Sequence, residues 1–337
     1  MKKITLVTFL VLSIYWAEAQ FNRMPLSFPN DGMTYSPETV SIVDQNNIWV
    51  GTMKRASGLY VKTYSKANRT TDGGNTWQFF TIPATGSPYI SDVEAQSNDI
   101  CYYLIDDINT AKGDVWKTVN GGTTWVKMTT TQFSGDYGDF IHLFSNDTLI
   151  VVGDPVSGYF NIQISNNGGS TWTQVPQSNM PPILTNESGM GAKWFSAIGN
   201  KIWFTTSLGR CFKSSDRGNH WTVTDINSAY GFQFSSVCFS DIQNGIFYCQ
   251  PTGLPFQYFL TRDGGTTWAP CSILPNFTLI GISSVGGFNQ GFIIAARENS
   301  GIYSQIYFTN DFFATLNLVD SVSVSYTHLT LPTIYSV

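Results

Sequence analysis

An eight-residue motif that recurs along the chain constrains the fold more than any other feature of the sequence. Five copies share a first Ser or Thr, a third Asp or Asn, a fifth Gly and a final Trp, and a sixth copy is degenerate. The copies read TTDGGNTW at 70–77, TVNGGTTW at 118–125, SNNGGSTW at 165–172, SSDRGNHW at 214–221, TRDGGTTW at 261–268 and TNDFFATL at 309–316. Consecutive copies end 47 to 49 residues apart. A period of this length predicts a repeat architecture, with about four short strands in each unit.

Each position of the motif has a physical role in a tight turn. The Asp or Asn side chain accepts hydrogen bonds from backbone N–H groups just ahead of it, and the Gly permits a positive φ. The Trp begins the next strand and offers a large flat surface to a neighbouring sheet. We therefore assign structural roles to Asp72, Gly74, Trp77, Asn120, Gly122, Trp125, Asn167, Gly169, Trp172, Asp216, Gly218, Trp221, Asp263, Gly265 and Trp268.

The stretches between the motifs have the pattern of strand, polar turn and strand. VDQNNIWVGT at 43–52 and FSDIQNGIFYCQ at 239–250 are two examples. The residues before and after each motif supply a third and a fourth strand, and no apolar period of 3.6 residues persists long enough for a helix. The sequence predicts an all-β chain folded as a six-bladed β-propeller of four-stranded antiparallel blades, or as a seven-bladed one that is truncated.

The motif resembles the Asp-box (BNR) repeat, and the resemblance covers roughly residues 37–320. Propellers of this kind are found in exported bacterial proteins such as type IX secretion substrates. More distant relatives of the fold are sialidases, xyloglucan-cleaving hydrolases, sortilin-type receptors and photosystem assembly factors. The resemblance implies the propeller fold and no single activity, because these proteins share the fold and differ in function.

The two ends of the chain do not follow the repeat. Lys2 and Lys3, the apolar stretch 4–16 and the small-x-small sequence Ala17-Glu18-Ala19 predict a signal peptide. We therefore expect export to the periplasm, the cell surface or the medium. The expected division is a signal peptide at 1–19, an N-terminal segment at 20–36, the propeller at 37–322 and a non-native or disordered tail at 323–337. The tail has no motif, and it resembles a translated sequencing adapter.

The composition excludes several classes of partner. Charged residues make up 12% of the chain, the formal net charge is −5, and no basic run indicates a nucleic-acid partner. The three His and five Cys residues show no zinc-ligand spacing, so we expect no metal and no cofactor. We also expect a monomer without a transmembrane segment.

Cys238 and Cys249 form a candidate disulfide because they flank a predicted hairpin turn. They would face each other across a turn at Gln243-Asn244. A type I′ turn at Asn244-Gly245 is an equally good sequence signal and would break that register.

Strand alternation sorts the connections into two ends of each blade. The motif turns and the first-to-second-strand turns share one end, which we call the motif face. The other connections share the opposite end, the long-loop face, where we expect ligands to bind because the loops are longer and irregular. Carboxylates, aromatic rings and arginines are expected there. The candidate ligand-binding residues are Asp136, Tyr137, Asp139, Asp154, Tyr159, Glu187, Arg210 and Arg297.

These residues are compatible with two classes of function. We expect a non-catalytic module that binds a protein or a glycan at the cell surface or outside the cell. The alternative is a glycoside hydrolase, sialidase-like or other, in which two carboxylates from Asp136, Asp139, Asp154 and Glu187 oppose each other. Two carboxylates facing each other across a deep central cleft would favour the enzyme, and a shallow funnel lined by aromatic rings would favour binding.

Overall fold

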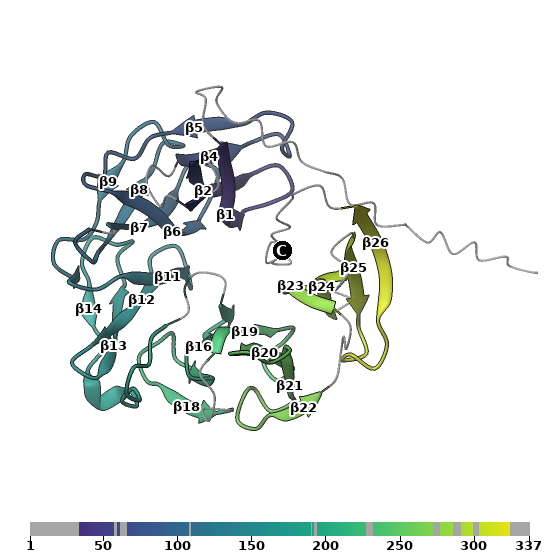
Figure 1. Ribbon diagram of the computed structural model, residues 1–337. Helices are drawn as coiled ribbons and strands as arrows, with labels where there is room; N and C mark the ends of the chain where they lie inside the picture. Colours follow the sequence, from purple (N-terminus) through teal and green to yellow (C-terminus); the bar gives the residue numbers. More distant parts are fainter. Residues whose placement is uncertain are drawn as a thin grey trace, which may run out of the picture.

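Six antiparallel sheets are arranged radially around a common centre (Figure 1). The computed structural model describes residues 34–56, 59–60, 66–107, 109–189, 191, 194–226, 232–271, 277–285, 291–298 and 303–323. The expected signal peptide, most of the expected N-terminal segment and the tail from residue 324 lie outside these residues. Each sheet is built from one continuous stretch of chain, and we number these sheets blades 1 to 6.

The blades follow one another in chain order. Blade 1 contains β1 (Thr34–Ile42), β2 (Ile48–Ala56), β3 (Leu59–Tyr60), β4 (Lys66–Thr70) and β5 (Gln78–Phe80). Blade 2 contains β6 (Pro88–Ala95), β7 (Cys101–Asp107), β8 (Lys112–Thr118), β9 (Val126–Lys127) and β10 (Phe133–Ser134). Blade 3 contains β11 (Gly138–Leu143), β12 (Leu149–Val156), β13 (Tyr159–Ser165) and β14 (Thr173–Gln174), and a 3-10 turn, η1 (Gln177–Asn179), follows it.

Blade 4 contains β15 (Phe195–Ile198), β16 (Lys201–Thr205), β17 (Arg210–Ser214) and β18 (Thr222–Asp225). Blade 5 contains β19 (Phe232–Phe239), β20 (Gly245–Pro251), β21 (Gln257–Thr261) and β22 (Ala269–Cys271). Blade 6 contains β23 (Phe277–Val285), β24 (Gly291–Glu298), β25 (Tyr303–Thr309) and β26 (Asn317–Ser323). In Figure 1 the first strands β1, β6, β11, β19 and β23 lie nearest the centre. This confirms the six-bladed propeller, to which blades 1 and 2 each add one two-residue strand, β3 and β10.

The motif turns are closed by the side chains that the sequence indicates. In the first copy, the Thr70 hydroxyl accepts a hydrogen bond from the Gly74 N–H (2.9 Å), and the Asp72 carboxylate accepts one from the Thr76 N–H (2.9 Å). Gly73 and Gly74 have φ of 70° and 90°, the region that favours glycine. The degenerate sixth copy forms the same turn, with Phe313 N–H donating to the Thr309 hydroxyl (3.1 Å).

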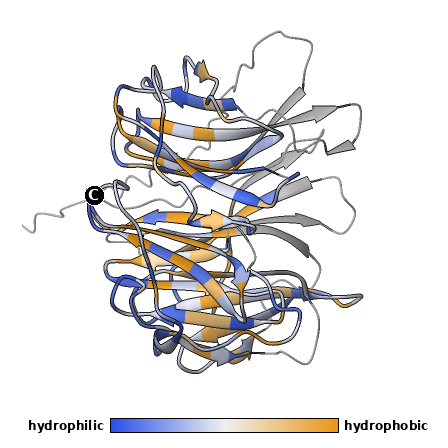
Figure 2. Cartoon of the chain, turned by 90° about the vertical axis from the view of Figure 1, so that its left-hand side faces the viewer, coloured by the Kyte–Doolittle hydropathy of each residue, from blue (hydrophilic) through white to orange (hydrophobic). Residues whose placement is uncertain are grey.

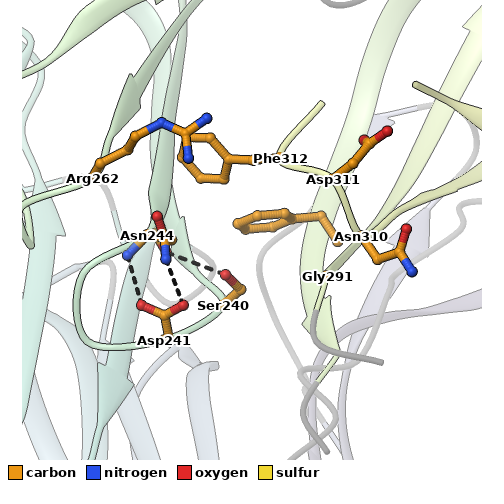
Figure 3. A pocket seen from close by; sticks show the side chains of 9 residues that line it. Ser240, Asp241, Asn244, Arg262, Gly291, Asn310, Asp311 and Phe312 are labelled. Atoms are coloured by element: carbon orange, nitrogen blue, oxygen red, sulfur yellow. Dashed lines mark hydrogen bonds between the residues drawn. The ribbon is translucent and has the colours of Figure 1, made fainter. Parts of the chain in front are cut away.

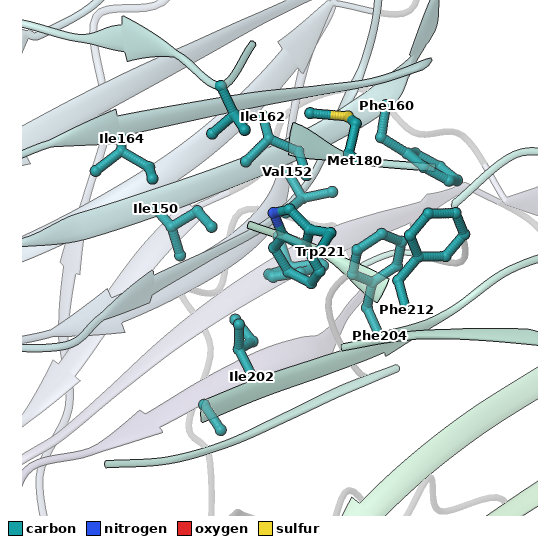
Figure 4. Close-up of a cluster of buried hydrophobic side chains, with 13 residues drawn as sticks. Ile150, Val152, Phe160, Ile162, Ile164, Met180, Ile202, Phe204, Phe212 and Trp221 are labelled. Carbon is teal, nitrogen blue, oxygen red and sulfur yellow. The ribbon is translucent and has the colours of Figure 1, made fainter. Parts of the chain in front are cut away.

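Hydrophobic side chains fill the spaces between neighbouring blades. The cartoon coloured by hydropathy shows hydrophobic residues along the strands, alternating with hydrophilic ones (Figure 2). Between blades 3 and 4, Trp221 packs with Phe204 and Ile150 in one buried cluster (Figure 4). We expected all five motif Trp residues to be buried, but only Trp221 is, at 5% exposed. The other four are half-buried, and three of them, Trp125, Trp172 and Trp268, pack against buried clusters.

The candidate disulfide between Cys238 and Cys249 is not formed, and both thiols are free and buried. Neither of the two expected turns is present. Instead the Asp241 side chain accepts hydrogen bonds from the N–H groups of Gln243 (2.7 Å) and Asn244 (2.8 Å), which closes a five-residue loop between β19 and β20. In the resulting register Cys238 lies opposite Ile246, and Cys249 lies opposite Ser235.

Candidate functional site

Seven of the eight candidate ligand-binding residues lie together at the long-loop end of blades 3 and 4. Asp136 and Tyr137 lie between β10 and β11, Asp139 in β11, Asp154 in β12, Tyr159 in β13, Glu187 between η1 and β15, and Arg210 in β17. Arg297 lies in β24 of blade 6, opposite Thr278 and Ser304. The topology therefore separates Arg297 from the other seven.

Asp136, Asp139 and Asp154 gather with a fourth carboxyl group, that of Asp106 at the end of β7. The pKa values of Asp106, Asp136 and Asp139 are all raised in part by Asp154. Asp139 and Asp154 each lie at an irregularity in strand pairing. For Asp139 it falls between Gly138 and Phe140, and for Asp154 between Gly153 and Pro155. Such bulges redirect a side chain out of the alternating pattern, and here they bring two carboxyl groups toward the same point.

Asp106 and Asp136 are part of the scaffold, because they are only 1% and 5% exposed and both accept hydrogen bonds from the surrounding structure. Asp106 accepts hydrogen bonds from the Ser91 hydroxyl and from the Gly138 N–H (2.9 Å). Asn161 donates to Asp136 (2.8 Å). These contacts join blade 2 to blade 3, so the two carboxyl groups fix the loops of this face.

Burial raises the pKa of all four carboxyl groups. It raises the pKa of Asp106 to about 7 and the pKa of Asp136 to about 6, although their hydrogen-bond donors oppose the shift. For Asp139, burial and then the charges of Asp154, Asp106 and Asp136 hold the pKa well above its usual range. Neighbouring carboxyl groups titrate together, so this cluster retains protons near neutral pH.

Gly189 covers the outer side of the cluster. Its N–H donates a hydrogen bond that lowers the pKa of Asp154 against the larger effect of burial. Any Cβ at this position would overlap the Asp139 carboxyl group. The Oδ2 atom of Asp139 is buried and has no hydrogen-bond partner among the described residues. The segment around Gly189 therefore lies directly on two of the candidate carboxyl groups.

Glu187 and Arg210 form a buried ion pair that holds the same segment on blade 4. Arg210 Nε donates to Glu187 Oε1 (2.8 Å), Arg210 Nη2 donates to Glu187 Oε2, and the Thr206 hydroxyl donates to Glu187 Oε1 (2.5 Å). Arg210 also donates to the Pro182 carbonyl (2.9 Å). The two charges neutralise each other inside the protein, so their structural role is to hold the connection between blades 3 and 4 in place.

The most exposed apolar residues beside the cluster are Val156, at 43%, and Leu184, at 39%. The Ile183 N–H donates to the Gly158 carbonyl (2.9 Å), which ties the two loops that carry them. The Leu184 N–H donates to Glu187 (2.8 Å), so the buried ion pair also positions Leu184. We call Val156, Ile183 and Leu184 the apolar rim; half-buried Tyr159 lies at the other end of the β12–β13 turn, opposite Val156.

A second buried carboxyl group links three blades near the centre of the ring. Asp92 in β6 accepts hydrogen bonds from the Thr39 hydroxyl of β1 (2.8 Å) and from the Ile141 N–H of β11 (3.0 Å). Burial raises the pKa of Asp92 to about 8. Two residues along the strand, Glu94 accepts from the Leu143 N–H (3.2 Å) and contacts His142.

Sequence reasoning missed Asp92, Asp106 and the apolar rim. Asp106 lies near the end of the second strand of its blade, as Asp154 does, and that shared position is the signal that could have found it. The described part of the chain holds no group of three or more His, Cys, Asp or Glu side chains able to bind a metal. Among the described residues, no helix has the length and hydrophobicity needed to cross a membrane.

The geometry differs from what a glycosidase needs. Retaining and inverting enzymes place two carboxyl groups on either side of a sugar, about 5 to 9.5 Å apart with room between them. Here Asp106 and Asp136 are buried, and Gly189 lies against Asp139 and Asp154. The arrangement can hold and exchange protons and can present negative charge at the base of the apolar rim.

No known protein family matches the sequence, and no curated protein matches it. Solved structures resemble its fold at low sequence identity. YCF48 bound to D1 peptide has a TM-score of 0.59 and 13% identity, over 85% of this chain and 82% of that chain. YCF48 from Cyanidioschyzon merolae has a TM-score of 0.50 and 18% identity, over 79% of this chain and 78% of that one.

Hydrolases are also among the similar structures. The GH74 xyloglucanase from Xanthomonas campestris has a TM-score of 0.58 and 12% identity over 83% of this chain, which spans 46% of the enzyme. At these identities the similarity establishes the fold alone. The chain is a β-propeller whose structural neighbours include both a peptide-binding protein and glycoside hydrolases.

Proposed function

We propose that this chain is an exported, non-catalytic β-propeller that binds a segment of a partner protein at the long-loop end of blades 3 and 4. The observation that carries the proposal is the position of the apolar rim. Val156 and Leu184 are exposed beside carboxyl groups that are built into the scaffold. An exposed apolar surface with a polar border is typical of a protein-binding site. The peptide bound to the similar YCF48 structure supports a protein ligand over a glycan.

The chemistry of this surface defines the segment that would fit. Apolar side chains of the partner would pack on Val156 and Leu184. A Lys or Arg beside them would meet the half-buried Asp154 carboxyl group, which has no ion pair with a described basic residue. The expected ligand is therefore an extended segment in which a basic residue adjoins apolar ones.

Export and membership of the Asp-box family belong to the same proposal. The basic and apolar N-terminus supports export, and the six motif turns support the family, including type IX secretion substrates. Mass spectrometry of the protein secreted by its native host would test the expected cleavage after Ala19.

A displayed library of random peptides, selected against the folded protein, tests the binding proposal. We expect the selected sequences to combine a basic residue with apolar neighbours. Leu184→Asp and Val156→Asp should each weaken the best peptide by about tenfold or more, because a charge replaces an apolar contact. Val126→Asp is the matched control, since Val126 is 60% exposed on blade 2, away from the rim. Equal binding by all three variants would reject the rim as the site.

The second candidate is a glycoside hydrolase, favoured by the coupled carboxyl groups Asp139 and Asp154 and by the similar xyloglucanase. Purified protein incubated with xyloglucan and with a sialoside tests it. Turnover that Asp154→Asn abolishes would establish the enzyme and exclude the non-catalytic proposal. We expect no turnover, because Gly189 lies against the Asp139 carboxyl group and leaves no room for a sugar between Asp139 and Asp154.

A further inference from the structure

A hollow of about 420 Å³ lies on the motif face, between the turns of blades 5 and 6. Ser240, Asp241, Asn244 and Arg262 line it from blade 5, and Asn310, Asp311 and Phe312 line it from blade 6 (Figure 3). Its size falls within the range of about 300–1,000 Å³ that is usual for small-molecule sites. It lies at the opposite end of the blades from the apolar rim, so it is independent of the proposed function.

Arg262 and Phe312 form the centre of the hollow. The guanidinium carbon of Arg262 lies 4.1 Å from the centre of the Phe312 ring, and Figure 3 shows the two side chains against each other. Among the described residues, Arg262 has no carboxylate partner and no hydrogen bond. Stacking fixes the plane of the guanidinium and leaves the N–H groups on its edge free to donate. These donors require acceptors from a ligand or from water.

Phe312 carries a large side chain at a motif position whose turn requires a positive φ. Its φ is 56°, in the left-handed region, and four other motif copies have glycine at the same position: Gly73, Gly121, Gly168 and Gly264. A side chain there costs about 1–2 kcal/mol. The adjacent Phe313 is explained by packing, because it stacks on buried Phe292 with ring centres 4.8 Å apart. Phe312 is half-buried; its ring centre lies 6.3 Å from that of Phe292, and the ring also meets Arg262 at the hollow.

Charge selects the kind of ligand that fits. Asp241 and Asp311 are ionised at neutral pH, because hydrogen bonds within their own loops lower the pKa of both. For Asp311 the hydroxyl of Thr315 is the largest cause, and the pKa falls to about 2. Two carboxylates and one arginine give the hollow a net negative charge, which disfavours an anion. A neutral polyol can accept from Arg262, donate to the carboxylates and place a C–H face against Phe312.

We propose that this hollow is a binding site for a neutral carbohydrate, with Arg262 and Phe312 as its central contacts. The amides of Asn244 and Asn310 supply further donors and acceptors for sugar hydroxyls. One or two sugar units fill the space between the two motif turns. The motif face thereby carries a small-ligand site that none of the five glycine-containing turns creates alone.

Binding of the full chain to short neutral oligosaccharides of glucose, xylose, mannose and galactose tests the proposal, with oligogalacturonate as the anionic comparison. We expect binding of at least one neutral sugar and weaker binding of the uronate. Arg262→Ala and Phe312→Gly should each weaken binding about tenfold or more. Phe312→Gly should unfold near the wild-type temperature, because relief of backbone strain offsets the lost ring contact. That variant separates binding from stability.

Arg217→Ala is the matched control, because Arg217 has a similarly positive φ of 61° in the blade 4 motif but donates to Asn200 (2.7 Å). It should bind as the wild type does. The proposal is overturned if no neutral sugar binds, if the uronate binds more tightly, or if Arg262→Ala and Phe312→Gly leave the affinity unchanged.

Discussion

Aspartates of the motif turns and buried aspartates of the long-loop face have pKa values shifted in opposite directions. On the motif face, the hydroxyl and N–H of Thr76 lower the pKa of Asp72 to about 2, and Thr315 does the same for Asp311. On the long-loop face, burial raises the pKa of Asp106 to about 7 and of Asp136 to about 6. The same side chain is thus an exposed anion with several donors in one place and a buried, protonatable group in the other.

The difference follows from what each carboxyl group connects. A motif aspartate bonds only within its own turn, so every blade repeats the contact independently. Asp106 and Asp136 bond to groups from other strands and loops, such as Gly138 and Asn161, and so they join blade to blade. The motif face is built from local, repeated contacts, and the long-loop face from contacts that occur once.

The largest expected effect comes from breaking the buried ion pair of the long-loop face. Arg210→Met leaves the Glu187 carboxylate buried without its partner, and we expect the free energy of unfolding to fall by about 3–5 kcal/mol. On the motif face, His220→Ala breaks an exposed contact with Asp216 and should change the free energy of unfolding by less than about 1 kcal/mol. Urea denaturation of both variants measures the contrast. Equal losses would show that burial does not distinguish the two faces.

The pH dependence of stability should show the opposite shifts directly. Carboxyl groups whose folded pKa is raised stabilise the fold fully below about pH 4, their unfolded pKa, and lose that contribution as pH rises through the folded values of about 6 for Asp136, 7 for Asp106 and 8 for Asp92. We expect the free energy of unfolding to fall by several kcal/mol as the pH of urea titrations rises from about 4 to 8.

Two conservative variants separate the faces in that experiment. Asp106→Asn should reduce the loss between about pH 4 and pH 7, because the amide oxygen still accepts from Gly138 and the side chain cannot ionise. Asp72→Asn should not change the loss of stability above pH 4. It should only reduce the loss of stability as pH falls through 2. The turn tolerates the change, since two other motif copies already have Asn at this position, Asn120 and Asn167. An Asp106→Asn profile identical to the wild type would contradict the assignment.

A smaller effect is expected where the segment between blades covers the cluster. Gly189→Ala places a Cβ against the Asp139 carboxyl group and should cost about 1–3 kcal/mol. Asp139→Ala removes the overlapping atoms, so the double variant should recover most of the loss from Gly189→Ala. Thermal unfolding of the four proteins gives the coupling. Additive losses would show that the two residues do not touch.

The repeated part of the molecule was predictable from sequence, and the contacts made once were not. The motif spacing predicts six blades, and the third Asp and fifth Gly of the motif predict the turn contacts of Asp72 and Gly74. The long-loop candidates could be placed on one face because strands alternate in direction. Sequence could not show that Asp139 and Asp154 sit in bulges, which turn both toward Gly189.

The side-chain pairing between loops could not be predicted from sequence either. Glu187 and Arg210 are 23 residues apart, with β15 and β16 between them, and only the fold shows that they neutralise each other. Arg297 was grouped with them by residue type and lies on another blade. The expected disulfide failed for a local reason, because the Asp241 side chain sets a loop length that the alternatives of Gln243-Asn244 and Asn244-Gly245 did not include.

Hydrogen–deuterium exchange of the protein with and without its selected peptide tests the central claim most directly. If the long-loop face binds the partner, amide protection should increase at residues 154–159 and 181–189, which carry the apolar rim, and should stay unchanged in the motif turns. Leu184→Asp should abolish that protection while Val126→Asp retains it. Protection confined to the motif turns, or protection that Leu184→Asp leaves intact, would contradict the account.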